Sequence, residues 1–132
     1  MFAWDSFLGA AKDLADRGDE AGLRCAMSRA YYAAFCSARN HLRDRESVPT
    51  PRTGAAHRTV WDKFEEGPDG DRRLIGTLGV RLRRSRNKAD YDDEVNPLAD
   101  LTDDALADAE QVLELLQRYK NSETFRWSLC VR

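Results

Sequence analysis

The chain has 132 residues, of which 42% are hydrophobic and 33% charged, and its net charge at pH 7 is −2. This length suits one domain with a modest core, and the near-neutral charge excludes a general attraction to nucleic acid. The sequence contains no signal-peptide pattern and no apolar run that could span a membrane, which favours a cytoplasmic protein. Its cysteines and histidines lack ligand-like spacing, so we expect reduced, buried thiols, no metal site and no cofactor.

The first half of the chain is predicted to form two helices. β-branched residues are scarce and alternating patterns are absent, which favours an all-α protein. The first helix is expected over residues 4–17, before Gly18, and the second over residues 20–44. Between Cys25 and Cys36 the second helix is apolar nearly all round. Such a helix is enclosed by its neighbours, or is covered by its own bundle on one side and a second subunit on the other.

Further helices are predicted after a loop with two prolines at 48–54. Thr53 is expected to cap a helix that runs to residue 66, and another helix is expected over residues 71–88. Residues 92–101 are expected to be irregular, and Thr102 to cap the last helix. The predicted core face of that helix is Leu106, Ala109, Val112, Leu113 and Leu116.

The sum of these elements is an antiparallel up-and-down bundle of four main helices plus a short helix. We expect residues 1–120 to form the domain and residues 121–132 to form a C-terminal tail. The charges are uneven along the chain. All charged side chains of residues 72–88 are basic, and all those of residues 90–114 are acidic. Such blocks form a local basic patch or neutralise each other.

Arg86 lies near the middle of the apolar stripe that Leu78, Leu82 and Ala89 form at about 100° per residue. A guanidinium stays charged and is costly to bury without a partner. We therefore expect Arg86 either to pair inside the protein, for example with Asp90 at i+4, or to bind an anion. Charges on the opposite face of this helix are expected to be simply solvated: Arg73, Arg81, Arg84 and Lys88.

Tyr91 follows Arg86 by five residues, which places the two about 140° apart on a straight helix. They converge only if the helix ends or unwinds near Ala89, or if two chains contribute. Otherwise Tyr91 is expected to plug the end of the bundle.

A second inward arginine, Arg29, is expected on the helix at 20–44, followed by Tyr31 and Tyr32. Asp90 and the tyrosine hydroxyls are its candidate partners, which indicates either a buried polar network or a catalytic role. His57, near a helix start, is interpreted as a capping or packing residue, with acid–base chemistry as the alternative.

Three segments in series resemble the HEPN family (higher eukaryotes and prokaryotes nucleotide-binding): residues 28–35, residues 57–64 and residues 82–91. The resemblance implies a helical bundle that dimerises. It also implies that many similar proteins are metal-independent ribonucleases of toxin, antiphage or CRISPR-associated systems. Their signature is an arginine, a polar residue and, a few positions on, a histidine, and two copies of it meet in one cleft.

Arg86 and Asn87 match the start of this signature, whereas Tyr91 stands where the histidine is usual. The resemblance therefore implies a homodimeric endoribonuclease with catalytic Arg86, Asn87 and Tyr91. Expected supporting residues are Arg29, Tyr32 and Asp90, and expected RNA-binding residues are Arg83, Arg84 and Lys88.

Tyrosine variants of the signature occur in family members similar to toxins encoded beside a minimal nucleotidyltransferase antitoxin, which can transfer AMP to that tyrosine. The alternative reading is a non-catalytic module that binds a nucleotide, a nucleotidyltransferase or another protein.

Overall fold

The computed structural model describes the backbone of residues 1–130 and the side chains of residues 1–122. This part of the chain contains five helices and no strand, which confirms the predicted all-α bundle with a short helix. The helices are α1 (Ser6–Asp16), α2 (Glu20–Arg45), α3 (Ala55–Glu65), α4 (Gly70–Tyr91) and α5 (Leu98–Cys130).

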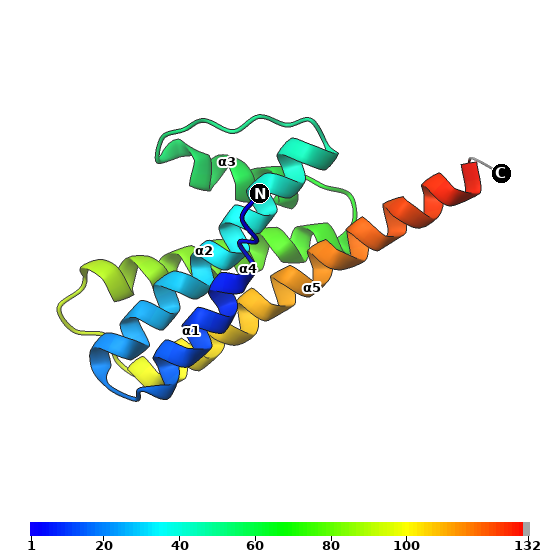
Figure 1. Ribbon diagram of the computed structural model, residues 1–132. Helices are drawn as coiled ribbons and strands as arrows, with labels where there is room; N and C mark the ends of the chain where they lie inside the picture. The colour runs from blue at the N-terminus through cyan, green and yellow to red at the C-terminus, as the bar shows by residue number, and fades with distance from the viewer. Residues whose placement is uncertain (131–132) are drawn as a thin grey trace.

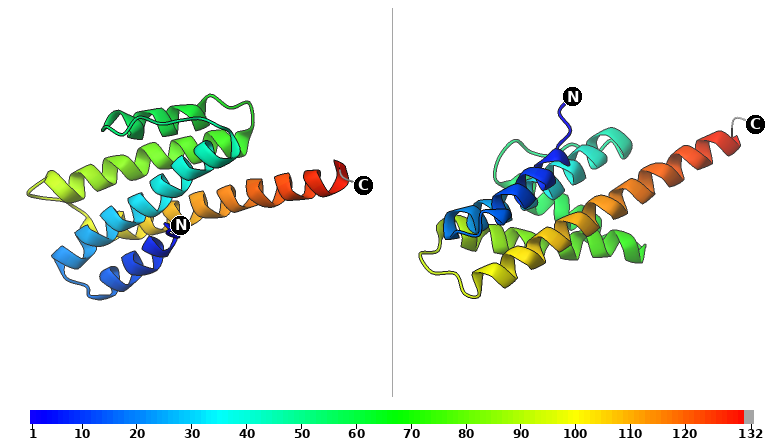
Figure 2. Two further views of the ribbon diagram at one scale, coloured as in Figure 1. Left: turned by 45° about the horizontal axis from the view of Figure 1, so that its top comes forward. Right: turned by 60° about the horizontal axis from the view of Figure 1, so that its bottom comes forward.

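Helix α2 is the centre of the molecule and contacts each of the other four helices. α1 runs antiparallel beside it, α4 and α5 form a second antiparallel pair, and α3 lies across one side of the bundle (Figure 1). The two further views agree that α5 extends beyond the other helices (Figure 2). The loop from α2 to α3 runs along the outside of the bundle, over α3 (Figure 1).

Most of the central part of α2 is buried within a single chain, although Arg29 and Tyr32 are half-buried. Its small residues have no exposed surface, which lets the surrounding helices approach closely: Ala26, Ala30, Ala33, Ala34 and Ala38. The apolar character of this helix thus follows from enclosure by its own bundle. It requires no second subunit.

Helices α3 and α4 pack closely at Gly79. A Cβ atom at this position would lie 2.2 Å from Cε3 of Trp61, whose side chain is 1% exposed. No ordinary side chain fits in that space without moving the indole ring. Gly79 therefore allows α3 to pack closely against α4, the helix that carries Arg86.

Two predicted helix ends are wrong, and both affect the candidate site. α4 continues to Tyr91, three residues beyond the predicted end at Lys88. α5 begins at Leu98 rather than after Thr102. Thr102 is fully buried, and its hydroxyl donates to the Leu98 carbonyl within the helix instead of capping it. The irregular segment is consequently short, and it turns directly from the end of α4 into α5.

Smaller corrections concern individual side chains. The cap position of α3 is Gly54, although the Thr53 hydroxyl still accepts a hydrogen bond from the Ala55 amide. Cys36 is buried as expected, whereas Cys25 is exposed. The side chain of Cys130 lies outside the described residues. The backbone of the predicted tail continues α5 as far as residue 130.

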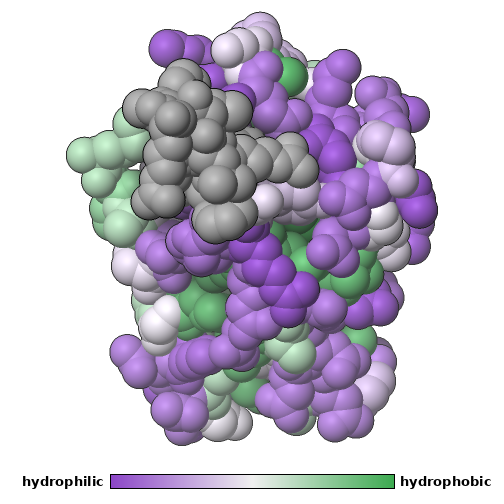
Figure 3. All heavy atoms as spheres, turned by 90° about the vertical axis from the view of Figure 1, so that its right-hand side faces the viewer, coloured by the Kyte–Doolittle hydropathy of each residue, from purple (hydrophilic) through white to green (hydrophobic). Residues whose placement is uncertain are grey.

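On α5, the predicted core face is shifted towards Ala105 and Leu115. These two residues are buried together with Ala109, Val112 and Leu116, whereas Leu106 and Leu113 are only half-buried. None of the described helices has the length and apolarity needed to cross a membrane. The face towards which α5 points is mostly hydrophilic, with hydrophobic side chains visible only as small areas between polar ones (Figure 3).

Candidate functional site

Arg86 lies near the C-terminal end of α4, where side chains from α4 and from α2 contact it. Its side chain is 18% exposed. One terminal nitrogen, Nη1, donates to the Asn87 amide oxygen at 2.9 Å, and the other, Nη2, donates to the Tyr32 hydroxyl at 2.9 Å. Both of these partners are neutral, so they orient the guanidinium without cancelling its charge.

Asp90 supplies the carboxylate beside Arg86. Its Oδ2 lies 2.9 Å from Nε of Arg86, yet the geometry forms no hydrogen bond, and Nε is buried without a hydrogen-bond partner. Ser28 of α2 donates to the same carboxylate oxygen at 3.4 Å. The internal i+4 pairing considered from the sequence is therefore present. Because it acts through Nε, it leaves the two terminal nitrogens facing neutral groups.

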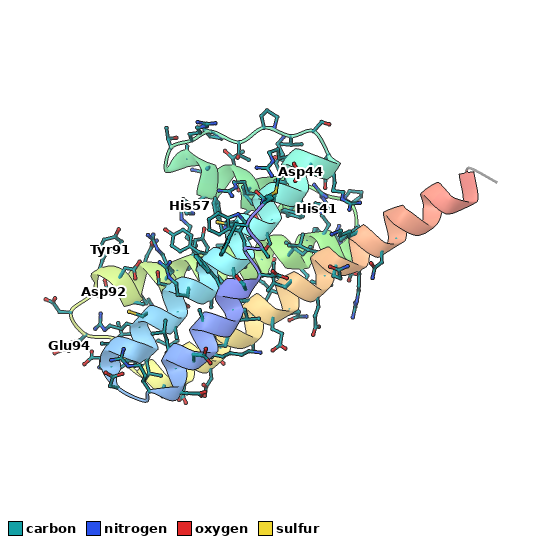
Figure 4. All side chains as sticks on the ribbon, in the orientation of Figure 1. His41, Asp44, His57, Tyr91, Asp92 and Glu94 are labelled. Atoms are coloured by element: carbon teal, nitrogen blue, oxygen red, sulfur yellow. The ribbon has the colours of Figure 1, made fainter. Side chains whose placement is uncertain are left out.

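Tyr91 lies at the last turn of α4 and is 74% exposed, so the expectation that it plugs the bundle is wrong. Figure 4 shows its side chain projecting outward, next to the loop that carries Asp92 and Glu94. The helix does not unwind at Ala89, but Cζ of Arg86 lies 5.7 Å from the centre of the Tyr91 ring. Two long side chains therefore meet at the helix surface, where a cation–π contact is favourable.

Arg29 stands behind Tyr32 rather than beside Asp90. Its guanidinium lies 5.2 Å from the Phe7 ring centre and 5.4 Å from the Tyr32 ring centre. Within the described residues it forms no ion pair. Because Arg86 lies 5.3 Å from the same Tyr32 ring, one phenol contacts both arginines, and Arg29 reaches the site only through it.

The basic residues expected to bind RNA do not share one face of α4. Arg84 and Lys88 are exposed, whereas Arg83 is half-buried. Arg83 lies near His57, since its charge contributes to lowering the pKa of that histidine. The structure thus brings Arg83 to the Arg86 side and leaves Arg84 and Lys88 on a neighbouring face.

Arg81 is not simply solvated, in contrast to the prediction. Its Nε and Nη2 donate to the two oxygens of Asp108 at 2.7 and 2.6 Å. The Asp108 side chain is only 10% exposed, so this bidentate pair joins α4 to α5. Nothing in the local sequence indicated it, because the partner lies on another helix.

His57 at the start of α3 joins a chain of buried hydrogen bonds. Trp61 Nε1 donates to the Tyr31 hydroxyl at 3.2 Å, and that hydroxyl lies 2.6 Å from His57 Nδ1. The Tyr31 hydroxyl is buried and its other partner, Trp61 Nε1, can only donate, so among the described residues Nδ1 of His57 is the acceptor available for the Tyr31 hydrogen. Burial lowers the pKa of His57, and the charges of Arg83 and Arg86 lower it further. The imidazole is therefore neutral near pH 7 and carries its proton on Nε2.

Burial also raises the pKa of Tyr31 well above its usual value, so this phenol stays protonated and keeps its hydrogen for His57. The histidine ring stacks on Phe35, with 4.3 Å between ring centres. Figure 4 places His57 between α3 and α2. The packing interpretation of His57 is thus supported by its contacts, and the sequence did not reveal the chain of donors that fixes its tautomer.

Arg24 is a further residue that the sequence pattern did not single out. Its Nη1 donates to the carbonyls of Ala89 and Asp92, and its Nη2 donates to the carbonyl of Asp93, at 3.1, 2.5 and 2.9 Å. These carbonyls lie at and just after the end of α4, where a helix leaves its acceptors unsatisfied. Arg24 therefore fixes the position of Asp90 and Tyr91 from α2.

Arg86, Tyr32, Asn87, Asp90 and Tyr91 together form what we call the Arg86 cluster. Two pockets of opposite charge lie beside it. The basic pocket, about 690 Å³, is lined by residues of α2, of the loop before α3 and of the start of α3, namely Tyr32, Phe35, Cys36, Arg39, Arg43, 49–53, Ala56 and His57. The acidic pocket, about 540 Å³, is lined by Glu20, Ala21, Arg24 and 90–93. Tyr32 belongs to the first and contacts Arg86, whereas Asp90 and Tyr91 belong to the second.

Among the described residues, no group of three His, Cys, Asp or Glu side chains is arranged to hold a metal ion. The chemistry that the cluster offers is anion binding by the terminal nitrogens of the Arg86 guanidinium, which have neutral groups around them, while the Asp90 carboxylate lies at Nε. This is the chemistry needed to hold a phosphate.

A family model described as the HEPN domain matches residues 5–119, which include the whole Arg86 cluster and both pockets. Searches of curated proteins and of solved structures found no match. A match of this extent shows that the chain belongs to the HEPN domain family.

Proposed function

We propose that the chain is a metal-independent endoribonuclease of the toxin or defence type, acting as a homodimer. The observation that carries the proposal is the Arg86 guanidinium, whose terminal nitrogens meet only the neutral groups of Asn87 and Tyr32. Membership of the HEPN family is compatible with nuclease and with nucleotide-binding roles. Asp90 pairs with Nε of Arg86, whereas the two terminal nitrogens face neutral groups, and this edge of the guanidinium suits a phosphate as its ligand.

Cleavage would use the RNA 2′-hydroxyl as nucleophile. The 2′-hydroxyl gives its proton to solvent water and its oxygen attacks the adjacent phosphorus, while the 5′-oxygen of the next nucleotide leaves and takes up a proton, so that a 2′,3′-cyclic phosphate and a 5′-hydroxyl remain. Arg86 would bind the non-bridging oxygens and offset the charge that develops on them. No step of this reaction calls for a bound metal ion.

The neighbours of Arg86 keep donors for the same phosphate. The Tyr32 hydroxyl accepts from Arg86, so its own hydrogen can be donated to a phosphate oxygen. The Asn87 oxygen also accepts from Arg86, which leaves its amide N–H groups for the phosphate or the 2′-hydroxyl. Tyr91, exposed beside them, would donate to the leaving oxygen, although a phenol with a usual pKa of about 10 is a weak acid for this purpose.

A second copy of the chain would complete the site. Asn87 and Tyr91 are exposed at the end of α4, so they are accessible to another protomer. Two copies of Arg86 around one phosphate would share its charge. The resemblance of the motif to the family signature supports this arrangement.

The direct test is Arg86→Ala against Arg58→Ala. Arg58 is a matched control, because it also pairs with a carboxylate at i+4, that of Asp62, but is 83% exposed on α3. With a structured RNA and a chelator present, we expect Arg86→Ala to lower cleavage by about 100-fold or more. Arg58→Ala should cleave like the wild type, and circular dichroism checks that both variants fold. Equal cleavage by all three proteins would refute the assignment.

The second candidate is a non-catalytic partner of a minimal nucleotidyltransferase, and the 74% exposure of Tyr91 favours it. In this hypothesis the Tyr91 hydroxyl loses its proton to solvent, its oxygen attacks the α-phosphorus of ATP, pyrophosphate leaves, and AMP stays on the phenol oxygen. Intact-mass measurement after incubation with ATP and a nucleotidyltransferase encoded beside this chain tests it. A mass gain of one AMP that Tyr91→Phe abolishes would support this reading, and a gain that persists in the variant would exclude Tyr91.

A further inference from the structure

The two pockets beside Arg86 carry opposite charges, so a bound polyanion would meet different surroundings on each side. The basic pocket contains three arginines and no acidic side chain among its lining residues. The acidic pocket contains Glu20, Asp90, Asp92 and Asp93 with Arg24 as its single base, and Arg24 is engaged with backbone carbonyls. A polyanion bound at Arg86 is therefore attracted to one side and repelled from the other.

We propose that the RNA strand runs from Arg86 into the basic pocket, which binds the nucleotide next to the cleaved phosphate. This inference rests on the proposed ribonuclease function and adds a binding subsite to it. A volume of about 690 Å³ falls within the roughly 300–1,000 Å³ typical of small-ligand sites. One nucleotide is a ligand of that size.

Tyr32 connects the two positions. Its hydroxyl accepts from Arg86 at 2.9 Å, while its side chain lines the basic pocket. A phosphate at Arg86 would thus lie at the hydroxyl of a phenol that also lines the basic pocket. Consecutive nucleotides of one strand can occupy both places without passing over the acidic residues.

His57 offers a hydrogen-bond donor to the pocket. Tyr31 occupies Nδ1, so the proton is on Nε2, which has no hydrogen-bond partner among the described residues. Since burial and two nearby arginines keep the pKa of His57 low, this donor is neutral near pH 7. A neutral N–H suits a base carbonyl or a phosphate oxygen, and its direction is fixed by the buried hydrogen bonds behind it.

Arg52 is the cation of the pocket best able to bind phosphate. Arg43 pairs with Asp44, and Arg39 packs over the rings of Trp4 and Phe35. Arg52 is exposed, and within the described residues it has no acidic partner. It stands in the loop just before α3, at the same pocket as His57, so its charge is available to a strand that enters there.

The test is RNA binding by Arg52→Ala, with Arg58→Ala as the control. Arg58 has the same charge and stands six residues away, but it does not line the pocket. The probe is a fluorescein-labelled, single-stranded 2′-O-methyl oligoribonucleotide, which cannot be cleaved because its 2′-oxygens are blocked. Fluorescence anisotropy over a salt series gives Kd and its salt dependence.

We expect Arg52→Ala to weaken binding several-fold and to reduce the slope of log Kd against log salt by about 0.7, the value for one phosphate contact on a single strand. Arg58→Ala should leave the slope unchanged. Nitrogen-15 spectra should also show the Nε2–H of His57 shifting when the probe is added.

The inference is overturned if the two variants bind alike, or if the wild type does not bind the probe. These outcomes are separate from failure of the proposed cleavage. Binding that depends on Arg52 without any Arg86-dependent cleavage would keep the pocket and reject the nuclease. Cleavage that depends on Arg86 but not on Arg52 would keep the nuclease and reject the pocket.

Discussion

The basic and acidic pockets lie on either side of one arginine, yet they are built in different ways. The wall of the basic pocket rests on a buried chain of hydrogen bonds from Trp61 through Tyr31 to His57. The acidic pocket lies between the start of α2, the end of α4 and the short loop after it, whose carbonyls accept hydrogen bonds from Arg24. The basic pocket is thus backed by the core, whereas the acidic pocket lies at the surface where two helix ends meet a short loop.

This difference teaches how a weakly acidic protein can bind an anion locally. The net charge of −2 averages over both sides. At Arg86 this average does not describe the local charge, because basic and acidic side chains line two different pockets. In the binding mode proposed above, the strand follows this difference in charge, and the buried hydrogen bonds from Trp61 to His57 hold the wall of the basic pocket.

The largest expected effect is on the basic side, from Tyr31→Phe. The change removes a buried hydroxyl and leaves Trp61 Nε1 and His57 Nδ1 without a partner. We expect the free energy of unfolding to fall by about 2–3 kcal/mol, measured by urea denaturation. Tyr32→Phe, which loses a half-buried hydroxyl, should cost less. Equal losses of stability in the two variants would contradict the view that the wall of the basic pocket is part of the core.

A smaller effect is expected on the acidic side, from Asp92→Asn combined with Asp93→Asn. These changes remove two negative charges and keep the backbone carbonyls that Arg24 binds. We expect the 2′-O-methyl oligoribonucleotide to bind about two- to threefold more tightly at low salt. Unchanged affinity at every salt concentration would mean that the acidic pocket has no part in directing the strand.

The smallest effect is a shift in the titration of His57, followed by proton NMR. Burial and the charges of Arg83 and Arg86 hold its pKa below the usual value of about 6.5. Arg86→Ala should raise this pKa, because one repelling charge is removed. A histidine whose pKa is lowered on folding stabilises the protein above its unfolded pKa, and this contribution is lost as the pH falls through the folded pKa. A titration identical in wild type and variant would place Arg86 too far away to act on His57.

Much of the fold could be predicted, because the signals for it are local. Two prolines so close together, Pro49 and Pro51, preclude a continuing helix, and the apolar face of each helix follows largely from its period. The start of α5 was mistaken because Thr102 followed by two aspartates looks like a cap. Its hydroxyl instead satisfies a carbonyl one turn back, which depends on the burial that neighbouring helices provide.

The candidate site could be predicted only in part. Periodicity correctly marked Arg86 as an arginine on the inner stripe and Asp90 as a partner at i+4. It did not identify Arg81 as paired, nor Arg24 as the residue that holds the end of α4. In both cases the partner lies on another helix, and a single sequence carries no record of which distant groups meet.

Gly79 has a consequence for how the protein tolerates substitution. The indole that a Cβ would displace belongs to Trp61, the first donor in the chain that ends at His57. In a saturation mutagenesis experiment, position 79 should therefore accept no other amino acid, although it touches neither pocket. A functional screen would score it like a residue of the site itself, and only a measurement of folding would tell the two kinds of position apart.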